Sequence, residues 1–224
     1  TFKDFLVESQ GANKHLEHIE DEVLNGGFDG VKKAITYLSS LGSTLKGSSS
    51  KKITITTKWD GAPAIVAGID PESGKFFVAT KHGAFSKVPK LNFSNEDIDN
   101  NHEGGLQDVL KDSLKYLKDI GIDGVYQGDL LYSPQKPKTI ETIDGESHIV
   151  FTPNTITYAI KTRSELGKRI NSSKLGIVWH TKYTGEVVNQ MNASFDVNVD
   201  NFTQTSDVWF KDAEYEKMDG IASF

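Results

Sequence analysis

Residues 56–65 read TTKWDGAPAI and stand between segments whose side chains follow a period of two. That period begins in ITITTK (residues 53–58), returns in AIVAGID (64–70) and continues in FFVATKH (76–82) after the turn sequence PESGK. A period of two, interrupted by Pro and Gly, is typical of antiparallel strands joined by turns. We therefore predict a β-hairpin over residues 64–82, preceded by a strand that ends at Lys58.

Outside the hairpin, the sequence predicts helices first and further strands later. Apolar residues recur at helical spacing up to a stop at Gly26-Gly27, and again from about Asp29. Residues 106–120 have the pattern of an amphipathic helix, and residues 163–170 that of a short one. Strand-like runs are GVYQGDLLY (124–132), HIVF (148–151), TITYAI (155–160) and LGIVWHTKY (175–183).

This order of elements predicts an α+β fold class, an antiparallel sheet preceded by an N-terminal helical arm. The polar segment GSSSKK (residues 47–52) is the best linker candidate. We accordingly divide the chain into a helical arm, residues 1–46, and a sheet domain, residues 47–224. The chain begins at Thr1 rather than at a methionine, so we expect that sequence is missing at one end or the other.

The composition limits the kinds of partner. The chain has 224 residues, a formal net charge of −6 and no cysteine. A metal ion would therefore need oxygen or imidazole ligands, and a nucleic acid would have to meet a local basic surface. No apolar run is long enough to cross a membrane, and nothing resembles a signal peptide. We expect a soluble cytoplasmic protein without a membrane partner.

Four short segments follow one another in an informative order. KWDG (residues 58–61) ends the first strand, TKHG (80–83) ends the hairpin, GDLL (128–131) lies in a later strand, and an aromatic strand carries Phe151 and Tyr158. In order, spacing and strand context these segments resemble the motifs of covalent nucleotidyltransferases, the superfamily of polynucleotide ligases and mRNA capping enzymes. The resemblance implies a ligase adenylation-domain-like core in residues 47–224.

The resemblance also implies a chemistry. Lys58 would attack the α-phosphate of ATP, form a lysyl-AMP intermediate and pass the nucleotide to an RNA or DNA end, which divides one difficult transfer into two. A neutral amine is needed for the attack, so we expect Lys58 to be partly buried beside cationic or metal charge. Mg²⁺ would neutralise the triphosphate, with Asp129 as its ligand.

The remaining roles follow from the same resemblance. Lys81 would contact the ribose or phosphates, Asp129 the ribose or metal, Lys182 the phosphates, and Phe151 or Tyr158 the base. The residues assigned to nucleotide binding are Trp59, Asp60, Gly61, Lys81, Gly83, Asp129, Phe151, Tyr158 and Lys182. RNA and DNA ends, and ATP and GTP, stay equally open.

The sequence departs from the superfamily pattern in three respects. Pro63 stands where ATP-dependent ligases commonly have arginine. LGIV (residues 175–178) occupies the place of a Glu-Gly-aliphatic-aliphatic motif but lacks its glutamate, whereas MDGIA (218–222) has an acid but lies almost at the end. Residues 1–224 also show no OB-like domain, which most members of the superfamily have. Either the metal site is altered or the last motifs lie beyond Phe224, and we favour the second explanation.

A second resemblance covers most of the chain. HLEHIEDEVLNGG (residues 15–27) together with KWDGAPA (58–64) is similar to a group of largely uncharacterised proteins of large tailed bacteriophages. It implies a phage origin and a place of action in the cytoplasm of an infected bacterial host. It does not indicate the substrate or the oligomeric state.

Plainer explanations stay open for individual residues. Lys58 can be a surface lysine before a turn, Lys81 can belong to an ordinary hairpin end, and Tyr158, like Trp59, can be a packing residue. Asp129 is harder to explain in this way, because a carboxylate in an apolar strand is costly unless it is paired or bound to metal.

Histidines raise two further alternatives. His180 can point into the groove of Lys58 or belong to the core. His15, His18 and Glu22 lie near one helix face and can bind a metal ion or form a solvated patch, which we favour. The function hypotheses are thus a nucleotidyltransferase, a catalytically degenerate nucleotide- or nucleic-acid-binding module of phage origin, and a metal hydrolase.

Overall fold

The computed structural model describes residues 19–46 and 57–213. The chain divides into two compact units, residues 1–55 with 215–224 and residues 56–214, and each is described by itself. The predicted domain boundary at residue 46 adjoins residues outside the described ranges, so it stays a prediction. His15 and His18 also lie outside these ranges.

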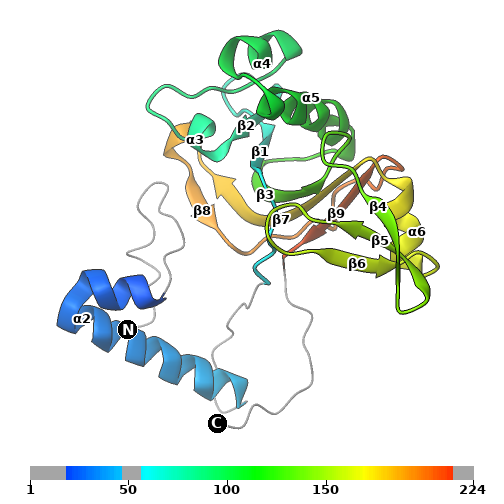
Figure 1. Ribbon diagram of the computed structural model, residues 1–224. Coiled ribbons are helices and arrows are strands. Elements are labelled where there is room, and N and C mark those ends of the chain that lie inside the picture. Colours follow the sequence, from blue (N-terminus) through cyan, green and yellow to red (C-terminus); the bar gives the residue numbers. More distant parts are fainter. Residues whose placement is uncertain (1–18, 47–56, 214–224) are drawn as a thin grey trace. The chain divides into compact units, whose positions relative to one another are not determined.

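The described part of the first unit is helix α2 (Ile19–Leu45), shown in blue in Figure 1. The helix is interrupted at Gly27, whose φ of 54° and ψ of −134° are not helical. Glycine adopts this backbone conformation without the steric cost that a Cβ atom imposes. The predicted stop at Gly26-Gly27 is confirmed as a break between two helical segments.

The second unit is built on a six-stranded sheet with the order β2-β1-β3-β7-β8 and β9 beside β7. All neighbouring strands are antiparallel except β7 and β9, which are parallel. The predicted hairpin is confirmed, and the fold is α+β with mainly antiparallel sheets. The strands are β1 (Ala64–Ile69), β2 (Phe76–Thr80), β3 (Val125–Tyr132), β7 (Leu175–Thr184), β8 (Asn192–Ser194) and β9 (Val208–Asp212).

A smaller antiparallel sheet follows β3 in the chain and consists of β4 (Thr139–Ile143), β5 (Glu146–Phe151) and β6 (Tyr158–Lys161). The sequence predicted β5, but it placed the start of β6 at residue 155, three residues too early. It did not predict β4, because all five residues of this strand are exposed and show no buried face.

The second unit also contains six helical segments within its described residues. Helix α3 (Lys81–Ala84) corrects the predicted strand end at residues 81–82: the Thr80 hydroxyl accepts a hydrogen bond from the Gly83 amide at 3.0 Å and so caps a helical turn. The others are α4 (Asn95–Asn101), α5 (Gly105–Leu117), η1 (Lys118–Ile120), α6 (Glu165–Ser172) and η2 (Val188–Gln190).

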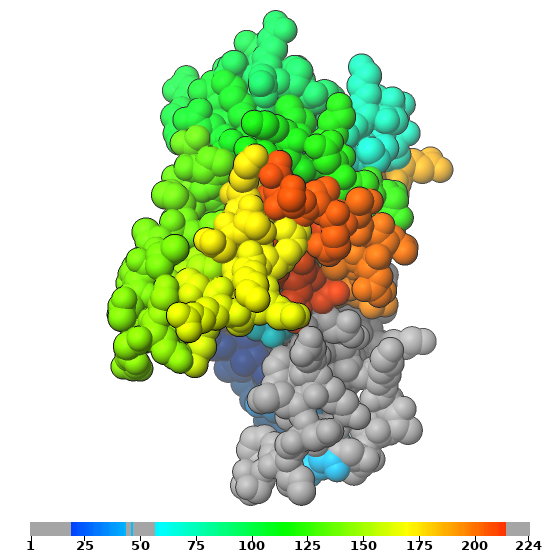
Figure 2. All heavy atoms as spheres, turned by 90° about the vertical axis from the view of Figure 1, so that its right-hand side faces the viewer, coloured from blue at the N-terminus to red at the C-terminus, as the bar shows by residue number. Residues whose placement is uncertain are grey.

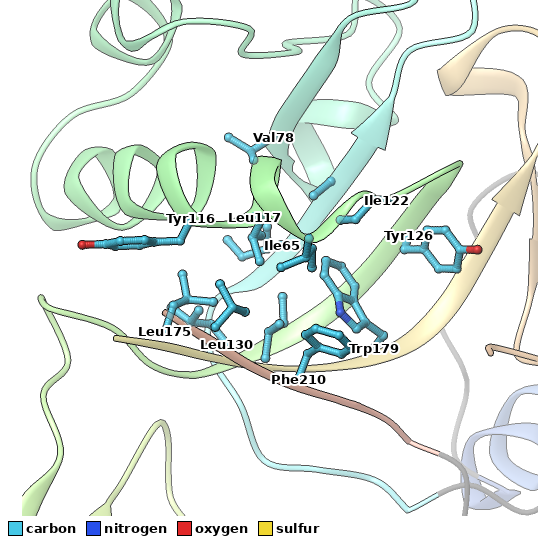
Figure 3. Packing of buried hydrophobic residues seen from close by; sticks show 14 of the residues in the cluster. Ile65, Val78, Tyr116, Leu117, Ile122, Tyr126, Leu130, Leu175, Trp179 and Phe210 are labelled. Carbon is cyan, nitrogen blue, oxygen red and sulfur yellow. The ribbon is translucent and has the colours of Figure 1, made fainter. Parts of the chain in front are cut away.

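The main core lies between α5 and one face of the six-stranded sheet. Figure 3 shows Leu117 of α5 facing Ile65, Leu130 and Trp179, which come from three different strands. These four side chains have no exposed surface. We call this the α5 face of the sheet, and the opposite face carries the candidate site.

Arg169 of α6 ties the small sheet region to the chain before β9. Its guanidinium donates hydrogen bonds to the carbonyl oxygens of Ser206, Thr205 and Val208. In Figure 2 the yellow segment that contains α6 lies directly against the orange segment that leads into β9. Five N–H donors in a planar fork suit such a multiple carbonyl contact. The start of β9 is thereby held beside β7.

Replacing Leu117 by Ala tests the core. The change leaves a cavity at a fully buried position and should lower the free energy of unfolding by about 2–5 kcal/mol. All three tryptophans, Trp59, Trp179 and Trp209, belong to the second unit, so tryptophan fluorescence during urea unfolding reports on that unit alone. Val88→Ala, at a side chain that is 77% exposed, is the control and should change the value by less than about 0.5 kcal/mol. Equal effects of the two changes would contradict this core.

Candidate functional site

Gly61 brings the KWDG segment into close contact with β3. A Cβ atom at Gly61 would lie 2.5 Å from the Asp129 Cβ and 2.9 Å from the Leu130 carbonyl oxygen, so only glycine permits this approach. Two backbone hydrogen bonds fix it, from the Ala62 amide to the Leu130 carbonyl (2.9 Å) and from the Leu130 amide to the Pro63 carbonyl (3.1 Å). Two predicted motifs, residues 58–61 and 128–131, therefore meet.

The Asp60 carboxylate is engaged by the loop before β6. It accepts hydrogen bonds from the Thr155 amide and hydroxyl (both 2.7 Å), the Asn154 side-chain amide (2.8 Å) and the Ile156 amide (2.6 Å). These donors, Thr155 first, hold the pKa of Asp60 well below its usual value. Because residues 154–156 bend around this carboxylate, β6 begins only at Tyr158.

The predicted base-stacking rings pack against one another. Tyr158 stacks on Trp59 and on Phe151, each with ring centroids 5.4 Å apart, and its hydroxyl accepts a hydrogen bond from the Asp60 amide at 2.8 Å. Phe151 is buried and also contacts Tyr132, while Trp59 meets Trp209 edge to face. Trp59, Phe151 and Tyr158 thus form an aromatic cluster that supports the KWDG segment.

Asp129 lies on the face of the sheet opposite α5, together with His180. The Asp129 Oδ1 and His180 Nε2 atoms are 3.5 Å apart, and both side chains are partly exposed. The second ring nitrogen of His180 is 2.8 Å from the Thr181 hydroxyl oxygen. The imidazole can therefore be oriented by Thr181 while its other nitrogen faces the carboxylate.

A β-bulge explains the direction of His180. Gln127 of β3 pairs with Thr181, whereas the next residue, Gly128, pairs with Trp179, so His180 is an extra residue in β7. A bulge of this kind changes the direction of a side chain and is common beside active sites. The sequence analysis named His180 without choosing between core and groove, and periodicity could not decide because a bulge interrupts it.

Lys81 completes a charged group that we call the polar strip: Lys81, Asp129 and His180. Burial lowers the pKa of the half-buried Lys81 amine, and the negative charge of Asp129 opposes that shift in part. Gly83, which is buried, is in the same short helix. Ile65 of β1 pairs with Thr80 of β2 on one side and with Gly128 of β3 on the other, so the TKHG and GDLL motifs lie one strand apart.

Lys58 and Lys182 are placed differently from the expectations. Lys58 is exposed, not partly buried; it lies outside any strand, beside Thr57, whose amide bonds to the Ala213 carbonyl at 2.8 Å. Lys182 lies on the α5 face, with its amine 5.4 Å from the centre of the Tyr126 ring. The structure does not bring Lys182 together with Asp129.

Lys211 of β9 is a residue that the sequence analysis missed. In neighbouring strands Asp129 pairs with Val178, and Val178 pairs with Lys211, so all three belong to one row across the sheet. Residues directly opposite each other in paired strands point to the same face. The sequence analysis predicted no strand here, because β9 is a parallel strand whose sequence, VWFKD, has only a short apolar run.

Asp129 is the residue predicted to bind Mg²⁺, and its surroundings limit the kind of metal. Within residues 19–46 and 57–213 no three His, Asp or Glu side chains gather in a way that could hold an ion. A carboxylate beside one imidazole does not fit a metal centre built by the protein alone. It does fit Mg²⁺, which commonly binds one or two carboxylates and keeps water and substrate phosphates as its other ligands.

Comparison with known proteins places the chain in a family. A model described as a family of unknown function, DUF6267, matches residues 13–224. The chain belongs to this family. No curated protein and no solved structure matches it. The family description names no activity.

Over the described ranges, no helix of this protein combines the length and apolar character needed to span a bilayer.

Replacing Asp60 by Asn tests the hydrogen bonds around its carboxylate. Folding lowers the Asp60 pKa below its ordinary 3.8, so the ionised form stabilises the fold above that value. This stabilisation is lost as the pH falls toward the folded-state pKa. The gap in urea midpoint between wild type and Asp60→Asn should therefore be constant above about pH 5 and shrink toward pH 3.

Tryptophan fluorescence gives the midpoints, because Trp59 precedes Asp60 directly. Thr155→Val removes one donor to the same carboxylate. It should reproduce part of the pH-dependent gap. A gap that stays the same from pH 7 to pH 3 would contradict a stabilising role of the ionised Asp60 carboxylate.

Proposed function

We propose that the chain is a nucleotidyltransferase core of the ligase type, which forms a covalent lysyl-nucleotide at Lys58. The proposal is supported chiefly by one observation: the three segments 58–61, 80–83 and 128–131 approach one another at the start of β1, around Asp129. The resemblance to covalent nucleotidyltransferases requires these segments to act together. The hairpin by itself brings residues 58–61 and 80–83 together, and the contact of Gly61 with Asp129 adds residues 128–131.

In the proposed reaction the Lys58 amine forms a bond to the α-phosphorus of ATP. The bond from that phosphorus to the bridging oxygen breaks, pyrophosphate leaves, and the amine loses its proton to solvent. Lys81 contributes positive charge beside the phosphates, and Asp129 orients the ribose or the ion that accompanies them. Mg²⁺, when bound with the nucleotide, neutralises phosphate charge and assists departure of pyrophosphate.

The exposed position of Lys58 is compatible with this role. The side chain begins three residues before the contact of Gly61 with Asp129, so a nucleotide bound over Asp129 lies next to the segment that carries the amine. The activated nucleotide would then pass to an RNA or DNA end. Pyrophosphate departure and this second transfer both proceed without a reductant or oxidant.

A nucleotide-binding module without transferase activity is the second candidate. The exposed amine of Lys58 and the aromatic cluster, in which Phe151 and Tyr158 are already stacked, favour it. Such a protein would bind the nucleotide through Lys81 and Asp129 and would not become modified. The same experiment separates the two candidates.

Intact-mass measurement after incubation with ATP or GTP and MgCl₂ tests the transfer. A transferase gains the mass of one nucleoside monophosphate, and the mass names the nucleotide. Lys58→Ala and Lys58→Arg should both abolish the gain, because the arginine side chain stays protonated and is no nucleophile.

Lys81→Ala is the matched control, since it removes a neighbouring amine whose pKa is lowered. It should slow the modification without removing it. An adduct that persists in Lys58→Ala and disappears in Lys81→Ala would make Lys81 the nucleophile and overturn the assignment. Nucleotide binding without any adduct would favour the binding module.

Asp129→Asn tests the carboxylate without changing its shape. A hydrogen bond to a charged group is worth about 1.5–3 kcal/mol, so loss of the charge should slow adduct formation by about 10- to 100-fold. The rate is followed by intact mass over time at saturating MgCl₂. Asp97→Asn, in helix α4, is the control and should leave the rate unchanged. Equal rates for both variants would remove Asp129 from the proposed site.

A further inference from the structure

A second feature of the molecule lies away from the polar strip. A cavity of about 650 Å³ is formed where β2, the start of α4 and helix α5 meet, and neither Lys58 nor any residue of the polar strip lines it. Its volume falls within the range of about 300–1,000 Å³ that is typical of small-molecule sites. The lining residues are Lys75, Phe76, Phe93, Asn95, Lys111, Asp112, Leu114, Lys115 and Lys118.

One wall of the cavity is basic. Lys111, Lys115 and Lys118 follow one another at spacings of four and three residues, which places them on the same side of the helix, and Lys75 lies in the lining ahead of β2. A chain with a net charge of −6 thus gathers four lysines around one cavity. Local charge of this kind attracts anionic ligands despite the overall acidity.

Acidic residues offset only part of this charge. Lys111 forms an ion pair with Asp99 at 2.5 Å, and Asp112 is the acid in the lining. The pKa of Asp112 is raised, chiefly by burial. One of its carboxylate oxygens, Oδ2, is buried and has no hydrogen-bond partner among the described residues. A ligand that brings donors, or protonation of this carboxyl, would satisfy that oxygen.

The remaining wall of the cavity is apolar. Phe76, Phe93 and Leu114 are half-buried; Phe76 and Leu114 pack against the main core, while Phe93 meets Phe77 edge to face with centroids 6.3 Å apart. Apolar side chains beside a row of lysines suit a ligand with a ring at one end and phosphate at the other. Inorganic anions would use the basic wall only.

We propose that this cavity is a second binding site, for a nucleotide that carries a 5′-phosphate. The phosphate would lie against Lys115 and Lys118, and the nucleoside against Phe76 and Leu114. The nucleotide can be free or can be the first residue of a strand. This inference does not depend on covalent transfer at Lys58, and it is tested with Lys58→Ala protein without Mg²⁺, so that the two proposals can fail separately.

Fluorescence anisotropy with a 3′-labelled single-stranded oligonucleotide, either 5′-phosphorylated or 5′-hydroxyl, is the first assay. The phosphorylated strand should bind about tenfold more tightly or better, because the terminal phosphate makes charged hydrogen bonds. Replacing Lys115 and Lys118 together by Gln should remove this difference. Replacing Lys87 and Lys168 by Gln, two exposed lysines outside the cavity, is the control of equal charge and should keep it.

Competition distinguishes the source and the chemistry of the ligand. AMP should displace the phosphorylated strand better than ribose 5-phosphate does, because only AMP has a base to place on the apolar wall. Should AMP bind while neither strand does, the ligand is a free nucleotide and the site stands. The proposal is overturned if the Lys115/Lys118 variant behaves like its control, or if an acidic peptide competes as well as AMP.

Discussion

The contact of Gly61 with β3 is the constraint on which the candidate site depends. With no Cβ, the chain passes so close to Asp129 that the backbone of residues 62–63 pairs with Leu130. Any larger residue would push the KWDG segment away from the sheet. The segment then carries Asp60 into the loop at residues 154–156 and Trp59 into the aromatic cluster. The absence of a Cβ atom at Gly61 therefore makes two separate sets of contacts possible, the hydrogen bonds of Asp60 and the ring packing of Trp59.

The small sheet acts as a support for this segment more than as a wall of a nucleotide pocket. Four hydrogen bonds to the Asp60 carboxylate and the stacking of Trp59 on Tyr158 join β5, β6 and their loop to residues 59–60. Trp59, Tyr158 and Phe151 stack on one another, so the ring faces in these contacts are already occupied. A base bound over Asp129 would thus have to find its contacts on the main sheet or displace Trp59, which stands at one end of the stack.

Much of the fold follows from local patterns, and the exceptions have physical causes. The hairpin at residues 64–80, the break at Gly27 and α5 were predictable because burial on one side leaves a period in the sequence. The strand β4 is exposed throughout, β9 pairs in parallel with a distant strand, and His180 occupies a bulge, so none of the three leaves such a period. The resemblance assigned Gly61, Asp129 and Lys182 to one nucleotide site. Gly61 does contact Asp129, whereas the bulge at His180 turns Lys182 to the α5 face of the sheet.

The second unit carries two separate concentrations of charge. Lys81, Asp129 and His180 mix both signs on one face, where a group can be oriented and its charge balanced. The cavity beside α5 carries chiefly lysines beside apolar rings, and Asp112 and the Lys111–Asp99 ion pair offset only part of its positive charge. Mixed charge suits chemistry on a phosphate, because the attacking and leaving groups need different partners. A mainly positive surface suits binding of a phosphate without reaction. The two regions therefore differ in kind, and retention of a phosphorylated ligand does not require the reactive lysine.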